Sequence, residues 1–401
     1  MNHRRPSLDS GYSWVVALAA AVVVFFQTGL ANVFTVFVPE FEQHLQINAS
    51  TVGLCTSIGM GLRGVLGPVW TALAKNISCR KLVMIGGLIS CLGMIAVSLS
   101  QSALHLGFSM ALLSVGSGIP SVTKVVHLKK YFVKKFNTAV SLVFTIGTAS
   151  LLLLPPFVEH LVSHFGWRGA ILIYGAMNLN ICVAGALMIE PYDFAEKGSK
   201  ENLLEDGKQY ADEKSSLLRS ATGCSKFFTS LVNSFGLSIL TQNRLLVLYL
   251  LAMALHELVV TGWSLFLVSH TLSNGYGTEK ASILATVGGG GALSGRLITG
   301  PVMDDDRVSG LSMFFILALG SALSLCSYPF INKYWALSGV SFMAGLCLGS
   351  TTPVLLVILK EIFADDIEGF AAAVGLQYMF RGVGMLSGGP LTGTYAEVLK
   401  R

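Results

Sequence analysis

Residues 196–216 read EKGSKENLLEDGKQYADEKSS, and this charged stretch divides the chain into two apolar parts. A segment so rich in Glu, Lys, Asp and Ser cannot bury enough apolar surface to form a core. It lies within a polar region from about residue 190 to residue 243, and long apolar runs flank that region on both sides. We therefore interpret residues 190–243 as a linker between two membrane-embedded parts.

The composition of the whole chain requires lipid as the main solvent. Of 401 residues, 53% are hydrophobic and 12% are charged, and the mean hydropathy is +0.66. Soluble domains carry about 25% charged residues. The composition therefore argues against a soluble enzyme, a secreted disulfide scaffold and a nucleic-acid-binding protein. The partner that we expect around most of the chain is membrane lipid.

Eleven apolar runs are long enough to cross a bilayer as helices, since a hydrocarbon core of about 30 Å needs about 20 helical residues. The runs lie at 14–38, 51–74, 82–100, 106–127, 138–160, 168–189, 245–270, 280–303, 309–330, 335–359 and 369–395. Six precede the linker and five follow it. This pattern predicts an all-α membrane protein of two six-helix halves around a central pathway, with the twelfth span missing. A truncated or mispredicted chain explains the missing span more simply than a true eleven-span protein.

The predicted domains follow from these runs. They are a cytoplasmic N-terminus at 1–13, an N-terminal six-span half at 14–189, the linker at 190–243, and a C-terminal half at 244–401 with five recognisable spans. Lys and Arg set the orientation, because they concentrate in cytoplasmic loops. The connections on the side of Arg4 and Arg5 carry 18 basic residues, and the opposite side carries 5. This asymmetry predicts that the N-terminus and the linker are cytoplasmic.

The sequence contains none of several motifs that would indicate another function. It has no phosphate-binding loop for an ATP-driven pump and no potassium-filter sequence. Its seven cysteines show no metal-binding or redox spacing, so we expect no metal and no cofactor. No nucleophile, base and orienting group recur together, which argues against an enzyme. The glycine run 288–291 lies in an apolar span, where small residues favour close helix packing.

Two short segments resemble signatures of a known family. Residues 9–16, DSGYSWVV, are similar to the D-G-G-W-G-W-V-V signature of the monocarboxylate transporter family (solute carrier family 16) in the major facilitator superfamily. Residues 131–135, YFVKK, are similar to its second signature, Y-F-x-[KR]-[KR]. The shared positions are Asp9, Gly11, Trp14, Tyr131, Phe132 and Lys134. The resemblance covers most of the chain and is stronger in the first half.

The resemblance implies a major facilitator fold and a plasma-membrane carrier that moves a small monocarboxylate, in some members together with a proton. It also implies that a single-span immunoglobulin-type chaperone is a candidate partner, because some family members need one. The physical reading of the same motifs is structural. A Trp at a helix start suits the membrane interface, and paired lysines anchor a cytoplasmic loop to anionic headgroups.

Charged residues inside spans are the candidate substrate contacts, because a charge at a helix centre costs at least about 2.5–3.5 kcal/mol. Arg296 lies in GGGGALSGRLITG, at the position that the resemblance assigns to the substrate-carboxylate arginine, and a guanidinium binds a carboxylate bidentately. The alternative is that Arg296 snorkels or pairs with the acidic residues 304–306. Arg381 and Arg63 are also near mid-span, and each could line the pathway or pair with a buried acid.

His256 and Glu257 stand side by side near the middle of the seventh span. Adjacent helical residues point about 100° apart, so only one of them need face the pathway. A buried Glu can carry a proton, and His titrates near physiological pH. The open alternatives are a proton relay and a structural ion pair with Arg296 or Arg381.

Two departures from the family argue against carrying its proton symport over to this chain. Asn32 stands where proton-coupled members have a Lys, and Ala292 stands where they have an Asp. One hypothesis is that Glu257 substitutes as the proton carrier. The other, which we favour, is a facilitated or otherwise coupled carrier of a larger or zwitterionic substrate such as creatine, carnitine or an amino acid. In either case the predicted substrate contacts are Arg296, Arg381 and Asn32. A non-transporting receptor or pseudo-transporter is the alternative of another class.

Overall fold

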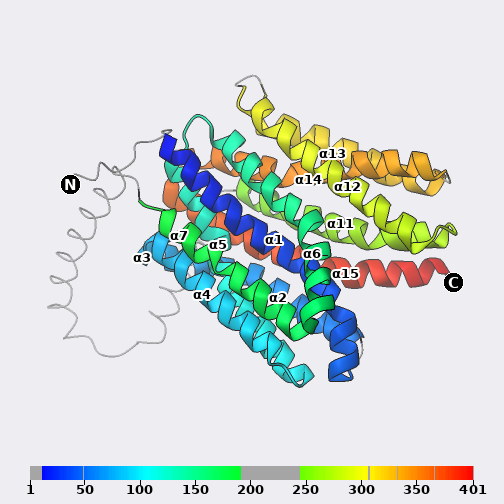
Figure 1. Cartoon of the computed structure of the whole chain (residues 1–401). Coiled ribbons are helices and arrows are strands. Elements are labelled where there is room, and N and C mark those ends of the chain that lie inside the picture. Colours follow the sequence, from blue (N-terminus) through cyan, green and yellow to red (C-terminus); the bar gives the residue numbers. More distant parts are fainter. Residues whose placement is uncertain are drawn as a thin grey trace, which may run out of the picture.

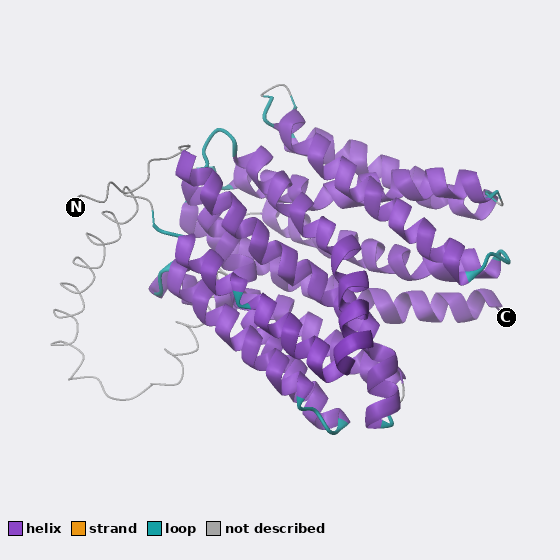
Figure 2. Ribbon diagram, viewed as in Figure 1, coloured by secondary structure: helices purple, strands orange, loops and turns teal. Residues whose placement is uncertain are grey.

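The computed structural model describes residues 11–47, 49–190, 244–305, 308–331, 333–364 and 366–400, and the regular structure in these ranges is helical. The predicted N-terminus at 1–13 and the linker at 190–243 lie mostly outside the described residues. Figure 2 shows helices joined by short loops at the two ends of the bundle.

The N-terminal half is built from seven helical segments. They are α1 (Gly11–Leu45), α2 (Ala49–Val65), α3 (Gly67–Asn76), α4 (Cys79–Ser98), α5 (Ala103–Tyr131), α6 (Phe136–Asn178) and α7 (Asn180–Leu187). Within α6 the chain turns at Gly166, where φ is +67°. Glycine adopts this left-handed backbone without a Cβ penalty. The turn separates the two predicted spans 138–160 and 168–189.

The described part of the C-terminal half contains five long helices and one short 3-10 turn. They are α11 (Arg244–Ser273), α12 (Thr278–Met303), α13 (Gly310–Ser327), η1 (Tyr328–Phe330), α14 (Tyr334–Ile362) and α15 (Ile367–Lys400). Pro301 near the end of α12 and Pro353 inside α14 lie in the interior of these helices. Neighbouring helices can satisfy the backbone groups that such prolines release in a membrane protein.

Every predicted span falls on helix. By length and apolar composition, seven of the described helices can cross a membrane, or eight if α2 and α3, which meet at 42°, form one span. The sequence predicts eleven spans, and part of the difference from seven lies in residues 136–187. They count as one helix by length and apolar composition, although the chain turns at Gly166 within them. The charged and glycine-rich α12 and α15 are not among the seven.

The two halves meet along their central helices. In Figure 1 the N-terminal helices lie together on one side and α11–α14 lie on the other, and α15 runs beside α2. Helix α12 contacts both α14 and α6, so it touches both halves. Within the C-terminal half, small residues permit the close approach of α12 to α14, because a Cβ at Gly291 would lie 2.1 Å from the Phe342 carbonyl oxygen of α14. The glycine run therefore serves helix packing, as the sequence indicates.

Candidate functional site

Five charged side chains lie inside the bundle, where the two halves meet. Lys124 and Glu257 are 3% and 2% exposed. Arg63, Arg296 and Arg381 are partly covered, and all five groups interact electrostatically with other members of the set. They come from α2, α5, α11, α12 and α15, so both halves contribute. The set has four basic groups and one acidic group, which leaves an excess of positive charge at membrane depth.

Arg296 joins the two halves through neutral acceptors. Its Nε donates to the Gly349 carbonyl oxygen of α14 at 2.7 Å. Its Nη1 donates to the Phe144 carbonyl oxygen of α6 at 3.1 Å and to the Thr148 hydroxyl of the same helix. Among the described residues Arg296 has no carboxylate within ion-pair distance. In particular, Asp304 accepts a hydrogen bond from Thr138 and does not pair with Arg296.

Glu257 and Arg381 form an ion pair within the C-terminal half. The Arg381 Nε lies 2.7 Å from Glu257 Oε1, and the side chains are 27% and 3% exposed. This is one of the alternatives that the sequence left open for Glu257. His256 is 9% exposed, and its Nε2 has no hydrogen-bond partner among the described residues.

In the N-terminal half, Lys124 and Arg63 of this set share a polar cluster with Gln27. Lys124 and Gln27 were not among the predicted site residues. Lys124 Nζ donates to Gln27 Oε1 of α1. Gln27 Nε2 donates to the Ser117 carbonyl oxygen at 2.8 Å, and the Gln27 carbonyl oxygen accepts from Arg63 Nη1 at 3.1 Å. The available signal was a single amide within the apolar run VVVFFQTGL and a lysine near the end of the fourth span.

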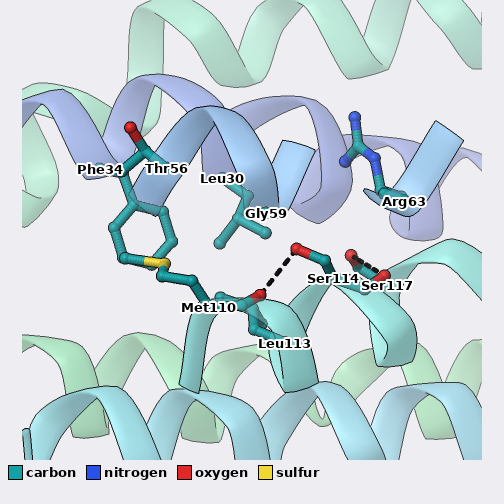
Figure 3. Close-up of a pocket in the computed structure, with 9 residues that line it drawn as sticks. All are labelled: Leu30, Phe34, Thr56, Gly59, Arg63, Met110, Leu113, Ser114 and Ser117. Atoms are coloured by element: carbon teal, nitrogen blue, oxygen red, sulfur yellow. Dashed lines mark hydrogen bonds between the residues drawn. The ribbon is translucent and has the colours of Figure 1, made fainter. Parts of the chain in front are cut away.

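A pocket beside Arg63 lies between α1, α2 and α5. Figure 3 shows Arg63 at one end, Phe34 and Thr56 at the other, and Leu30 and Met110 between them. The lining is mostly apolar and includes two serine hydroxyls, and its members are Leu30, Phe34, Thr56, Gly59, Arg63, Met110, Leu113, Ser114 and Ser117. The Ser114 hydroxyl donates to the Met110 carbonyl oxygen at 2.7 Å. The pocket therefore combines an apolar wall with a guanidinium at one end.

The two signature segments pack against each other, away from the central charges. The Trp14 and Phe132 rings meet edge to face with centroids 5.3 Å apart. The Tyr131 hydroxyl donates to the Ile189 carbonyl oxygen, and the Tyr12 hydroxyl donates to that of Leu187. Lys134 is exposed in the loop that follows α5, and Gly11 begins α1.

Two of the predicted site residues cannot be placed. Asp9 lies outside the described residues, and the side chain of Asn32 does so too, although its backbone belongs to α1. The structure therefore brings Arg63, Arg296, Arg381 and Glu257 into one charged set. It adds Lys124 to this set, and Gln27 as the neutral partner of Lys124 and Arg63.

Comparison with known proteins agrees with this architecture. The chain matches the family described as Major Facilitator Superfamily over residues 18–388. It is 28% identical to monocarboxylate transporter 2 of Mesocricetus auratus, over 98% of this chain and 80% of that protein. It is 29% identical to monocarboxylate transporter 13 of Bos taurus, over 99% of this chain and 86% of that protein.

Among solved structures, the chain resembles the proton:xylose symporter XylE bound to 6-bromo-6-deoxy-D-glucose. The TM-score is 0.67 at 15% identity, over 98% of this chain and 91% of that one. At this identity the likeness shows the fold alone. The all-α membrane fold predicted from the sequence is confirmed. The chain therefore belongs to the Major Facilitator Superfamily and is a divergent member of its monocarboxylate transporter family.

Proposed function

We propose that this chain is a secondary transporter that moves a small carboxylate-bearing metabolite across the plasma membrane by alternating access. The observation that carries the proposal is the charge balance of the central set, in which Glu257 is the one acid beside Arg63, Lys124, Arg296 and Arg381. Uncompensated charge at membrane depth is costly and marks substrate or ion pathways. An anionic substrate would neutralise part of this excess, so the charge balance favours an anion over the zwitterion, such as creatine, that the sequence alone led us to favour.

Arg296 is the proposed carboxylate contact. Its present partners are two carbonyl oxygens and a hydroxyl, and a carboxylate would bind a guanidinium more strongly than these neutral acceptors do. Because the same guanidinium touches α6 of one half and α14 of the other, substrate binding would exchange a contact between the halves for a contact with substrate. This exchange couples occupancy of the site to rocking of the two halves.

The pocket beside Arg63 is proposed to hold the apolar part of the substrate. Phe34, Leu30 and Met110 supply an apolar wall, and the Ser114 and Ser117 hydroxyls supply a few polar contacts. Such a lining suits a carboxylate with an apolar body better than a sugar, because a sugar needs a partner for every hydroxyl. Asn32, on the same helix as Phe34, remains a proposed neutral contact.

We propose that transport does not require Glu257 as a proton carrier. The ion pair between Glu257 and Arg381 supports a structural role for this carboxylate. His256, which is adjacent and buried, remains a charge-balance candidate.

The proposed topology places the N-terminus and residues 190–243 in the cytoplasm, with halves at 14–189 and 244–401. An epitope tag inserted in the linker should be accessible to antibody only after the plasma membrane is permeabilised. A single-span immunoglobulin-type chaperone is a possible partner only by resemblance to the family.

The test of function is uptake of labelled lactate, creatine and an aromatic amino acid into proteoliposomes, at equal pH and with an inward proton gradient. The variant is Arg296→Gln, and the matched control is Arg244→Gln, because Arg244 is exposed at the start of α11. We expect saturable uptake of a carboxylate that Arg296→Gln abolishes and Arg244→Gln preserves.

Three outcomes separate the alternatives. Uptake of creatine but not of a simple monocarboxylate would favour the zwitterion carrier. A proton-gradient stimulation that Glu257→Gln removes would make Glu257 the proton carrier. Absence of saturable carboxylate uptake by verified folded protein would overturn the proposal in favour of a non-transporting receptor.

A further inference from the structure

Three residues with metal-binding side chains meet at one end of the N-terminal half, and none of them belongs to the set of central charges. They are Cys79 at the start of α4, His127 in the last turns of α5, and Glu190 just after α7. The Cys sulfur, a ring nitrogen and a carboxylate oxygen all lie within 4.8 Å of one another. The sequence predicted no metal site because spacing along the chain does not connect residues 79, 127 and 190.

His127 is the observation that makes this cluster more than a chance contact. The side chain is 0% exposed, and neither ring nitrogen has a hydrogen-bond partner among the described residues. The Ile189 carbonyl oxygen lies beside the ring, but the hydrogen bond of good geometry that it accepts comes from the Tyr131 hydroxyl. A buried polar group without a partner is destabilising, and a ligand that uses the lone pair of the ring nitrogen would remove this cost.

We propose that Cys79, His127 and Glu190 bind a Zn²⁺ ion. Thiolate, imidazole and carboxylate are the ligands that zinc takes in proteins, and a set of three leaves the fourth tetrahedral position to water. The softer thiolate and the imidazole argue against Mg²⁺ and Ca²⁺, which bind oxygen. On binding, the Cys79 thiol releases its proton to solvent as the sulfur–zinc bond forms, while His127 coordinates as the neutral imidazole.

The geometry needs a modest contraction. Zinc–ligand bonds of about 2.0–2.3 Å place tetrahedral ligand atoms about 3.5 Å apart. The three atoms here are up to 4.8 Å apart, so a shift of about 1 Å completes the site. Glu190 can supply this shift, because it follows the end of α7 in non-helical backbone and its side chain is 26% exposed.

Lys130 is the neighbour that competes with the metal, and its position is compatible with binding. Its Nζ lies 3.0 Å from one Glu190 oxygen and 3.3 Å from the other. These contacts make an ion pair between the Lys130 ammonium and the Glu190 carboxylate. Zinc would take one oxygen while Lys130 keeps the other, as outer partners of metal-bound carboxylates commonly do.

Zinc binding would link three helix ends. It would hold the start of α4, the end of α5 and the chain after α7 together at the place where residues 191–243 begin. This role is independent of the proposed transport function.

The test uses the full chain, purified in detergent and freed of metal, with Co²⁺ as the spectroscopic probe and Zn²⁺ as the competitor. We expect one equivalent of Co²⁺ to produce a thiolate-to-cobalt charge-transfer absorption in the near ultraviolet, and Zn²⁺ to displace it. Cys79→Ser should abolish this absorption. The matched control is Cys91→Ser, because Cys91 lies in the same helix and outside the cluster.

His127→Gln and Glu190→Gln decide the question if Cys79→Ser fails to fold. Each should weaken Zn²⁺ binding at least about 10-fold in competition with a chromophoric chelator, because loss of even an outer partner costs about 10- to 100-fold. The proposal fails if the wild-type protein gives no charge-transfer absorption, if that absorption survives Cys79→Ser, or if Zn²⁺ affinity is unchanged in both His127→Gln and Glu190→Gln.

Discussion

At the scale of single residues, Arg296 is held by neutral oxygens of both halves, although an arginine inside a membrane protein commonly pairs with an acid. Ala292 stands where the resemblance to the family leads us to expect an Asp, and the Ala292 Cβ lies against Gly349 of α14. The arginine is therefore fixed in position while its charge is left for another partner.

Arg296→Lys should weaken transport although it keeps the positive charge. A lysine ammonium cannot reproduce the planar fork that binds a carboxylate bidentately. Loss of one hydrogen bond to a charged group costs about 1.5–3 kcal/mol, which is about 10- to 150-fold in half-saturation concentration. Uptake kinetics in proteoliposomes measure this change, with Arg244→Lys as the control. A half-saturation concentration equal to that of wild type would remove Arg296 from the site.

Glu257→Gln should destabilise the protein because it leaves Arg381 without its partner. A fully buried pair would lose about 3–5 kcal/mol, but Arg381 is 27% exposed, so we expect about 1–3 kcal/mol. The unfolding temperature in detergent reports the loss. The double variant Glu257→Gln with Arg381→Gln should recover part of it, since no unpaired charge remains. A double variant less stable than Glu257→Gln would contradict a structural ion pair.

At the scale of helices, α2 and α15 approach each other through glycines. A Cβ at Gly64 would lie 2.7 Å from the Gly382 Cα and 2.8 Å from the Tyr378 carbonyl oxygen. Both of these atoms belong to the backbone, so a rotamer change cannot relieve the contact. Because α2 and α15 come from different halves, this contact sets how closely the halves pack.

Gly64→Ala should therefore lower stability by about 1–3 kcal/mol, the usual cost of overpacking. Gly53→Ala is the matched control in the same helix, because a Cβ there meets nothing within 4 Å. Replacing glycine in an open helical position should be neutral or stabilising by about 0.5–1 kcal/mol. Thermal unfolding of the two variants side by side tests the contact, and equal unfolding temperatures would refute it.

At the scale of the whole molecule, the two halves are joined at the end that carries the loop after α5. Asn137 Nδ2 donates to the Met303 carbonyl oxygen at 2.7 Å, and the Thr138 hydroxyl donates to Asp304. From the other half, Lys360 Nζ donates to the Val133 carbonyl oxygen at 3.1 Å. The two halves are therefore in contact at this end of the bundle, which is the cytoplasmic end in the proposed topology.

Asn137→Ala together with Asp304→Ala should open this end. Each lost hydrogen bond is worth about 0.5–1.5 kcal/mol and the double variant loses two, so amide hydrogen exchange in residues 136–142 and 299–305 should quicken about 5- to 160-fold. Residues 103–109, at the start of α5, serve as the internal reference and should not change. Unchanged exchange at both contact segments would show that these bonds do not hold the halves together.

Much of the fold could be predicted because a membrane-spanning helix is formed by one run of consecutive apolar residues, which is visible in the sequence. Each apolar run had to become a helix to satisfy its own backbone groups in lipid. The turn at Gly166 was visible as a break between two such runs. Close helix packing at the glycine run 288–291 was visible in the sequence, and the structure identifies α14 as the partner helix.

The candidate site could be predicted only in part. Arg63, Arg296, Arg381 and Glu257 were identifiable because a charge within an apolar run is conspicuous and costly. Gln27 was not identified because a single amide in a span has no periodic pattern, and its role depends on Lys124, which lies 97 residues away.

The sequence by itself determined that the chain is a helical membrane protein of two halves. Its apolar composition, the length of its apolar runs and the polar region between them are all properties of consecutive residues. Only the tertiary structure decided the partners. It paired Glu257 with Arg381, connected Arg296 to both halves, and brought Cys79, His127 and Glu190 within 4.8 Å. The physical reason is that partner choice depends on the position and rotation of each helix in the bundle, which packing between helices sets and which no local pattern records.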